Sequence, residues 1–271
     1  MAERENKNQP KNLIEPTPEN LDLNEELIIE PALKEEEAKR EPTLAEKRVS
    51  REKQEKEDRL ASWAPITQLG KDVKSGKENN IDNILENRKK ILEPEIVDYL
   101  LGNLESDLLL IGQAKGKFGG GKRRAWRQTQ KKTKEGNVLT FSAMAVVGDK
   151  KGHIGLGTGK AKETLPAREK ALRKAKLNLI KIRRGCAHFD CSCGEDHTVP
   201  FVVEGKSGSV RVKLMPAPQG TGLVIGDELK KMLRLVGIKD IYAFSMGQTR
   251  TTFNHAKACF DALEKTTKLV K

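Results

Sequence analysis

Alternation of apolar and polar residues between positions 138 and 147 is the feature that most constrains the fold. Every second residue of this stretch is apolar: Leu139, Phe141, Ala143, Ala145 and Val147. Because successive side chains of a strand point to opposite faces of a sheet, the pattern predicts a strand with one packed face and one available face. A turn at residues 148–152 and a glycine-rich stretch at 153–159 follow, which predicts a hairpin.

The strongest predicted helix covers residues 163–182, directly after the hairpin. Pro166 falls in its first turn, where the missing N–H is tolerated. One apolar stripe consists of Ala171, Ala175, Leu179 and Ile182. Cations fill much of the remaining surface of this helix. Together with an apolar run at residues 108–111, the pattern predicts a first domain of three strands and a helix over residues 108–182.

A second domain is predicted over residues 199–268. One of its strands alternates apolar residues with Arg211 and Lys213, which indicates a half-buried strand with a basic outer face. A helix that Asp227 caps and Gly237 ends comes next, and then another strand and helix. The order strand, strand, helix, strand, helix predicts a compact α/β layer.

Charge is unevenly distributed along the 271 residues, whose formal net charge is +12. Residues 1–62 hold 12 Lys and Arg against 17 Asp and Glu, and the rest of the chain holds 39 against 22. The predicted domains are therefore strongly basic, which favours a nucleic-acid partner. We predict that residues 1–62 form an acidic tail that is disordered or ordered only by a partner, and that residues 63–107 form a docking strap with short helices.

A basic loop is predicted at residues 115–134, which contain three consecutive glycines, Trp126 and no acid. Glycine allows the backbone to approach phosphates, cations neutralise them, and the indole can stack on an exposed base. The alternative is a charge run that is merely solvated. The nine cations are Lys115, Lys117, Lys122, Arg123, Arg124, Arg127, Lys131, Lys132 and Lys134.

A Cys/His loop at residues 183–198 separates the two predicted domains. Its spacing is C-x4-C-x-C-x3-H, with candidate ligands Cys186, Cys191, Cys193 and His197. Four soft ligands in one loop suit tetrahedral zinc, although the spacing is not that of a standard zinc finger. Structural zinc, unligated thiols and redox chemistry all remain open, while Cys259 is predicted to lie in the core of the last helix.

Other sites are excluded or left open by the sequence. Residues 152–160 are rich in glycine but lack the spacing of a nucleotide-binding loop, so no nucleotide cofactor is expected. Either the backbone and Lys160 lie against RNA phosphate there, or the glycines serve packing. No catalytic triad or carboxylate pair stands out, and His153 and His255 are predicted to be structural, so no enzyme is expected. No secretion signal or membrane span is visible, which predicts a cytoplasmic protein without a membrane partner.

Several motifs resemble the small-subunit ribosomal protein five family, in its archaeal and eukaryotic form. Residues 141–163, FSAMAVVGDKKGHIGLGTGKAKE, resemble the signature of the first domain of that family. Residues 208–223, GSVRVKLMPAPQGTGL, resemble the core of the second. The strap at 63–70 and the turn at 183–200 are similar to the archaeal and eukaryotic branch, so the resemblance covers about residues 63–268.

The resemblance implies an α+β fold with two parts. The first is a double-stranded-RNA-binding-like domain, and the second is a small α/β domain with a left-handed β-α-β crossover. It also implies a structural, non-enzymatic role in translation, with binding to 16S-type ribosomal RNA near the decoding centre and the messenger entry channel. Implied partners are messenger RNA and small-subunit ribosomal proteins four and eight. By the family's pattern, the loop at 115–134 joins two strands and reaches into the RNA, although it is longer and more basic than expected of the family.

Three functional hypotheses are consistent with these features. The first is a ribosomal RNA-binding protein that neutralises phosphates and reads shape. The second is a free double-stranded-RNA-binding regulator, and the third is a zinc- or nucleotide-dependent RNA enzyme. Besides Trp126 and the nine loop cations, the predicted RNA contacts are Lys160, Lys162, Arg168, Arg173, Arg211 and Lys213.

Overall fold

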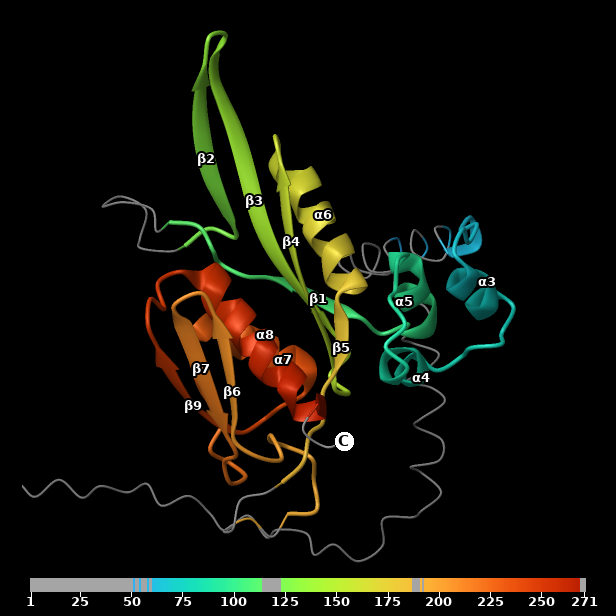
Figure 1. Cartoon of the computed structure of the whole chain (residues 1–271), viewed down its shortest axis with the longest axis vertical. Helices are drawn as coiled ribbons and strands as arrows, with labels where there is room; N and C mark the ends of the chain where they lie inside the picture. The colour runs from blue at the N-terminus through green and yellow to red at the C-terminus, as the bar shows by residue number, and fades with distance from the viewer. Residues whose placement is uncertain are drawn as a thin grey trace, which may run out of the picture. The chain divides into compact units, whose positions relative to one another are not determined.

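A computed structural model describes residues 51, 54, 58, 60–113, 123–186, 191 and 193–268 (Figure 1). The chain divides into two units, Met1–Arg59 and Leu60–Lys271, and the second contains all the elements discussed below. Most of the predicted tail lies outside the described residues, as do Lys115, Lys117 and Lys122. Of the tail residues that are described, 51, 54, 58, 60 and 61 are helical and residue 62 lies in a turn.

Three short helices come before the first sheet: α3 (Gln68–Lys74), α4 (Ile81–Glu86) and α5 (Pro94–Leu100). They surround a small apolar cluster that includes Trp63, Val73 and Ile96. Glu93 fixes the entrance to α3, because it accepts hydrogen bonds from Trp63 Nε1 at 2.9 Å and from the backbone N–H of Thr67 at 2.6 Å. Residues 63–67 are thereby fastened to the start of α5.

The first sheet has the strand order β1-β3-β4-β5, with β2 also paired to β3. Its strands are β1 (Glu105–Leu108), β2 (Trp126–Thr133), β3 (Gly136–Gly148), β4 (His153–Ala161) and β5 (Leu179–Lys181). Strands β1 and β2 share one edge of β3, since β1 pairs with residues 145–148 and β2 with residues 136–143. The second half of the predicted basic loop is therefore a strand, and the β2–β3 hairpin extends past the helix that covers the sheet (Figure 1).

Helix α6 (Thr164–Leu177) lies unusually close to β4. A Cβ atom at Gly155, Gly157 or Gly159 would collide with the carbonyl oxygen of an alanine in α6, well inside the 3.0 Å limit of real Cβ contacts. The alternating glycines of β4 are therefore explained by helix packing. Their second predicted role, approach to RNA phosphate, is not needed to account for them.

Three further details of the sequence prediction for this domain are wrong. The first strand lies before most of the apolar run at residues 108–111, because β1 covers Glu105–Leu108. Helix α6 ends at Leu177, and the last predicted helical residues form β5, which pairs with β4 at His153–Gly155. The predicted free face of β3 is also absent near its end, because Met144 and Val146 pack with residues of the second domain while Ala143 and Ala145 pack against α6. This half of the strand is buried on both sides.

The second sheet has the order β6-β7-β9-β8, in which only β8 and β9 form a parallel pair. Its strands are β6 (Val203–Ser207), β7 (Val210–Met215), β8 (Leu223–Val224) and β9 (Ile241–Met246). Helix α7 (Asp227–Val236) connects β8 to β9, and α8 (Thr252–Lys268) follows. The short β8 was not predicted. The two sheets with their helices make a mixed α/β structure, in which α7 and α8 contribute to one core shared with the first sheet.

The ends of α7 are partly as predicted. Gly237 ends the helix in the left-handed conformation at φ 89°, as a C-terminal glycine should. The predicted cap at Asp227 is wrong, because Gly226 occupies the N-cap position and no side chain caps the helix. Asp227 instead lies in the first turn, where its charge favours the positive end of the helix dipole.

Candidate RNA-binding surface and candidate metal centre

The β2–β3 hairpin carries exposed cations on both of its faces. Sheet register places Arg127 opposite Ser142, and Ser142 opposite Lys160 of β4, so these three side chains lie in one row. Because strand side chains alternate, Lys131 lies on the same face as Arg127, and Lys132 lies on the opposite face. Within the described part of the chain, none of these four cations has a carboxylate within 4.0 Å.

Trp126 belongs to the face of the sheet that α6 covers. The guanidinium of Arg168 lies 5.2 Å from the centre of its ring, which is a cation–π contact. The structure thus brings together two predicted RNA contacts from separate elements. It also shows that the indole, half-buried under Arg168, is less available for base stacking than the sequence predicts.

Arg123 and Arg124 are exposed just before β2, and Lys134 is exposed in the turn between β2 and β3. The other four predicted contacts form two groups. Lys162 and Arg173 are exposed near the end of β4 and on α6, next to the hairpin. Arg211 and Lys213 are exposed on β7, in the other sheet. The structure therefore does not combine all predicted RNA contacts into one surface. We define the hairpin surface as the six cations Arg123, Arg124, Arg127, Lys131, Lys132 and Lys160.

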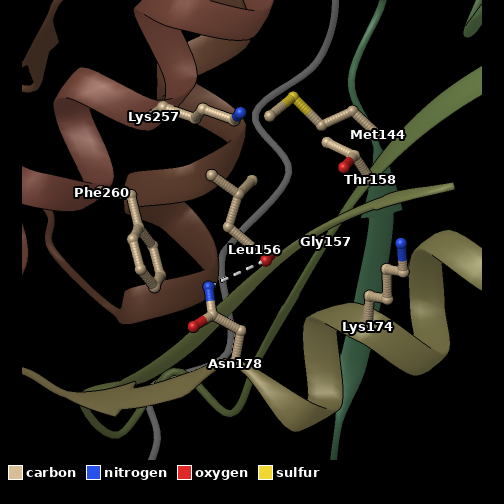
Figure 2. A pocket seen from close by; sticks show the side chains of 8 residues that line it. All are labelled: Met144, Leu156, Gly157, Thr158, Lys174, Asn178, Lys257 and Phe260. Carbon is tan, nitrogen blue, oxygen red and sulfur yellow. Dashed lines mark hydrogen bonds between the residues drawn. The ribbon is translucent and has the colours of Figure 1, made fainter. Parts of the chain in front are cut away.

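A groove between the two domains sets Lys174, one of the cations expected on the basic helix, near Lys257, which sequence reasoning did not identify. Figure 2 shows Lys174 of α6 and Lys257 of α8 on opposite sides of a cavity of about 420 Å³. Its apolar lining includes Met144, Leu156 and Phe260, and Asn178 Nδ2 donates to the carbonyl of Leu156 at 3.2 Å. No spacing along the chain could identify this groove, because its walls come from both domains.

The four predicted metal ligands converge. Their ligand atoms all lie within 4.8 Å of one another, and we call this group the Cys/His centre. Cys191 Sγ lies 2.9 Å from Cys193 Sγ and 3.5 Å from His197 Nε2, while Cys193 Sγ lies 3.6 Å from Cys186 Sγ. Hydrogen bonds from the Cys193 thiol and from backbone N–H groups lower the pKa of Cys191 to about 6, which favours a thiolate there. The cluster could hold a metal ion.

His197 is oriented as a metal-binding histidine should be. Its Nε2 faces the thiols, and its buried Nδ1 lies 2.8 Å from Asp240 Oδ2, in a contact less well aligned than an ideal hydrogen bond. A carboxylate behind the ring is the common outer partner of a ligating histidine. Asp240 also accepts a hydrogen bond from the backbone of Gly222 at 2.7 Å, so it ties the centre to the loop after β7. The donor set therefore fits a zinc ion.

The other cysteine and histidines have structural roles. Cys259 is fully buried in the core, as predicted, and burial raises the pKa of its thiol to about 12. His153 joins β4 to α4, since its Nδ1 lies 2.6 Å from Asp149 and its Nε2 lies 2.7 Å from Asp82. Burial alone would lower the pKa of His153, but the hydrogen bonds to the two carboxylates outweigh it and raise the pKa. His255 contacts Ser245 Oγ at 3.1 Å.

Comparison with known proteins identifies the family. Residues 125–183 match the model of the ribosomal protein S5 N-terminal domain, and residues 205–270 match that of the C-terminal domain. The chain is 52% identical to the small ribosomal subunit protein uS5 of Nanoarchaeum equitans over 206 residues, which cover 76% of this chain and 88% of that protein. The chain belongs to the ribosomal protein S5 family.

Further relatives in the S5 family are also archaeal. The uS5 protein of Aeropyrum pernix is 47% identical over 78% of this chain and 90% of its own length. The uS5 protein of Methanoregula boonei is 48% identical over 76% of this chain and 93% of its own length. These matches confirm the predicted family and branch, and with them the prediction that the chain is not an enzyme. In the described part of the chain, no helix is long and apolar enough to cross a membrane.

Proposed function

We propose that the chain is a structural protein of the small ribosomal subunit and binds small-subunit ribosomal RNA chiefly through the hairpin surface. The observation that carries this proposal is a long two-stranded hairpin whose exposed cations have no carboxylate partner among the described residues. Such cations would neutralise RNA phosphates and release counterions, while the rigid hairpin sets their spacing. Recognition would thus depend on RNA shape more than on base identity.

Several finer features of the proposal rest on family membership alone. They are a position near the decoding centre and the messenger entry channel, a contribution to translation fidelity, and contact with small-subunit proteins four and eight. The left-handed crossover of the β8-α7-β9 unit belongs to the same group of predictions.

Binding to RNA duplexes at several salt concentrations tests the hairpin surface. Replacing Arg123, Arg124 and Arg127 with Ala should weaken binding and reduce the salt slope by about one for each phosphate that is no longer neutralised. A matched control replaces Lys71, Lys77 and Lys90, which are exposed on and around the N-terminal helices, and should leave the slope unchanged. An unchanged slope in the first variant would show that the hairpin surface is a solvated bystander.

Co-sedimentation tests the assignment to the ribosome. The full chain should remain with small subunits in gradients of high salt concentration, as a built-in structural protein would. If the chain is absent from small subunits but still binds duplex RNA, the free double-stranded-RNA-binding regulator is the better hypothesis.

We also propose that the Cys/His centre binds one structural zinc ion. Three thiols, an imidazole and the carboxylate of Asp240 behind it support this assignment. Bound zinc would hold its four ligands near the loop after β7. Asp240 contacts His197 and accepts a hydrogen bond from Gly222 of that loop, and Thr198, next to His197, accepts one from Ala217. Metal analysis should find about one zinc per chain, lost in Cys193→Ser and retained in Cys259→Ala. Less than about one zinc per four purified chains would count against the proposal.

A further inference from the structure

The outer face of the second sheet exposes large apolar side chains. The inward residues of its strands, such as Val212, Leu214 and Ile241, are fully buried against the helices. The outward residues of β9 are instead exposed, with Tyr242 at 38%, Phe244 at 55% and Met246 at 44%. Neither α7 nor α8 covers this face, since both contribute to the core on the other side. Contiguous exposed apolar area of this kind usually marks a binding surface.

Cations lie beside these side chains. Sheet register pairs Phe244 with Lys213 and Met246 with Arg211, and residues paired across neighbouring strands point to the same face. Lys206 of β6 continues the cationic row next to Arg211. Among the strand residues of this face the only acid is Glu204. None of the three cations has a carboxylate within 4.0 Å in the described part of the chain.

We propose that this face binds a single-stranded segment of small-subunit RNA, with bases stacked on Tyr242 and Phe244 and phosphates held by Arg211 and Lys213. An aromatic row beside a cationic row is the combination by which sheets bind single-stranded nucleic acid. The two aromatic side chains lie about 6.7 Å apart along the strand, so each can take its own base. We call these four residues the platform.

Charge favours RNA over a protein as the occupant. The buried centres of protein interfaces are poor in lysine, and unpaired cations there would lose hydration without compensation. On RNA the same cations gain phosphates and release counterions. The inference rests on the proposed role in the small subunit, but it concerns a second surface that is separate from the hairpin and reads a different form of RNA.

Two RNA probes test the platform with the full chain: a fluorescent oligouridine and a stable RNA duplex. Phe244→Ala and Tyr242→Ala should each weaken oligouridine binding by about tenfold, because a stacked base is lost. Duplex binding should stay unchanged, and this also shows that the variants fold. The matched control Tyr99→Ala removes a half-exposed aromatic side chain from α5 and should change neither affinity.

The outcomes separate this inference from the proposed function. Unchanged oligouridine binding in both platform variants would overturn the platform, whereas the hairpin variant alone tests the duplex surface. Phe244→Leu keeps apolar area but removes the aromatic ring, and it should also weaken oligouridine binding. In assembled small subunits, a photo-crosslinking residue at position 244 should couple to RNA. Coupling to protein alone would overturn the proposal and identify the face as a protein interface.

Discussion

The Cys/His centre and the β2–β3 hairpin are both rich in chemically active side chains, but they use them in opposite ways. In the centre, the ligand atoms turn toward one another, and Asp240 and the backbone of Gly222 complete the network. On the hairpin, exposed cations such as Arg127 and Lys131 have no carboxylate partner among the described residues. Side chains whose partners lie inside the chain contribute to stability, whereas charged side chains without such partners are left to bind another molecule. Substitutions should therefore separate the two properties.

Gly157→Ala should have the largest effect on stability, because β4 leaves no room for a side chain between itself and α6. The new Cβ atom would collide with the carbonyl of Ala171 and the backbone of Ala175, so β4 or α6 must move. Overpacking typically lowers the free energy of unfolding by about 1–3 kcal/mol. We expect the upper end of that range or more, because the new Cβ atom would lie well under 3.0 Å from two backbone atoms. Denaturant unfolding checks the expectation. Gly102→Ala is the matched control, since nothing lies within 4 Å of its added Cβ atom, and it should change stability little.

Asp240→Asn should come next, at about 1–3 kcal/mol, because a buried carboxylate that serves two partners loses its charge. The same change should reduce zinc affinity about 10- to 100-fold through the misdirected His197 ring. Unfolding with and without a chelator, combined with a competitive zinc titration, measures both effects. Asp227→Asn, at an exposed site, loses only a helix-dipole interaction and an exposed ion pair with Lys230, so it should lower stability by less than about 1 kcal/mol and leave zinc affinity unchanged. If the two variants had the same stability and the same zinc affinity, Asp240 would not support the Cys/His centre.

Sequence reasoning succeeded where a pattern is local and failed where packing decides. Alternation in residues 138–147 predicted β3, but its face toward Met144 and Val146 was expected to be free, and the second domain buries it. Likewise the predicted helix and its stripe continued to Ile182, whereas α6 ends at Leu177 because residues 179–181 form β5 and pair with β4. Both errors concern partners distant in sequence, which a single-sequence pattern does not contain.

The candidate sites show the same division. Ligand types and close spacing predicted the Cys/His centre, and the four atoms do converge. Asp240 lies more than forty residues after His197, so the Cys/His spacing gives no indication of it. Its carboxylate nevertheless orients the ring of His197. Sequence reasoning named Arg211 and Lys213 as RNA contacts but predicted no stacking surface. The position of Phe244 beside Lys213 is visible only when the register of β7 and β9 is known.

His153→Gln should lower stability by about 1–2 kcal/mol near pH 6, since two hydrogen bonds to carboxylates are lost. The pKa of His153 is raised above 6.5, so its contribution is complete below pH 6.5 and disappears as the pH rises through the folded-state pKa. The pKa values of Asp82 and Asp149 are lowered from 3.8, so their contribution is lost only in acid.

Unfolding of both proteins from pH 5.5 to 8.5 checks this dependence, and the gap between wild type and variant should shrink above pH 6.5. His255 provides the contrast, because burial lowers its pKa. Protonation of this buried ring is unfavourable in the folded state, so the contribution of His255 to the free energy of unfolding should become less favourable as the pH falls. If the difference in unfolding free energy between wild type and His153→Gln stayed constant with pH, the contacts of His153 with Asp82 and Asp149 would not be ionic.

Replacing Lys131 and Lys132 with Ala should have the smallest effect on stability, within about 0.5 kcal/mol, because neither side chain has a carboxylate partner in the described structure. Lys176→Ala is the control, since it removes an ion pair with Asp98 at 2.6 Å and should destabilise measurably. The affinity for duplex RNA should instead fall when Lys131 and Lys132 are replaced and stay unchanged in Lys176→Ala. If the hairpin variant instead unfolded more readily than Lys176→Ala, its cations would be structural, and the two regions would no longer differ in how they use their charged side chains.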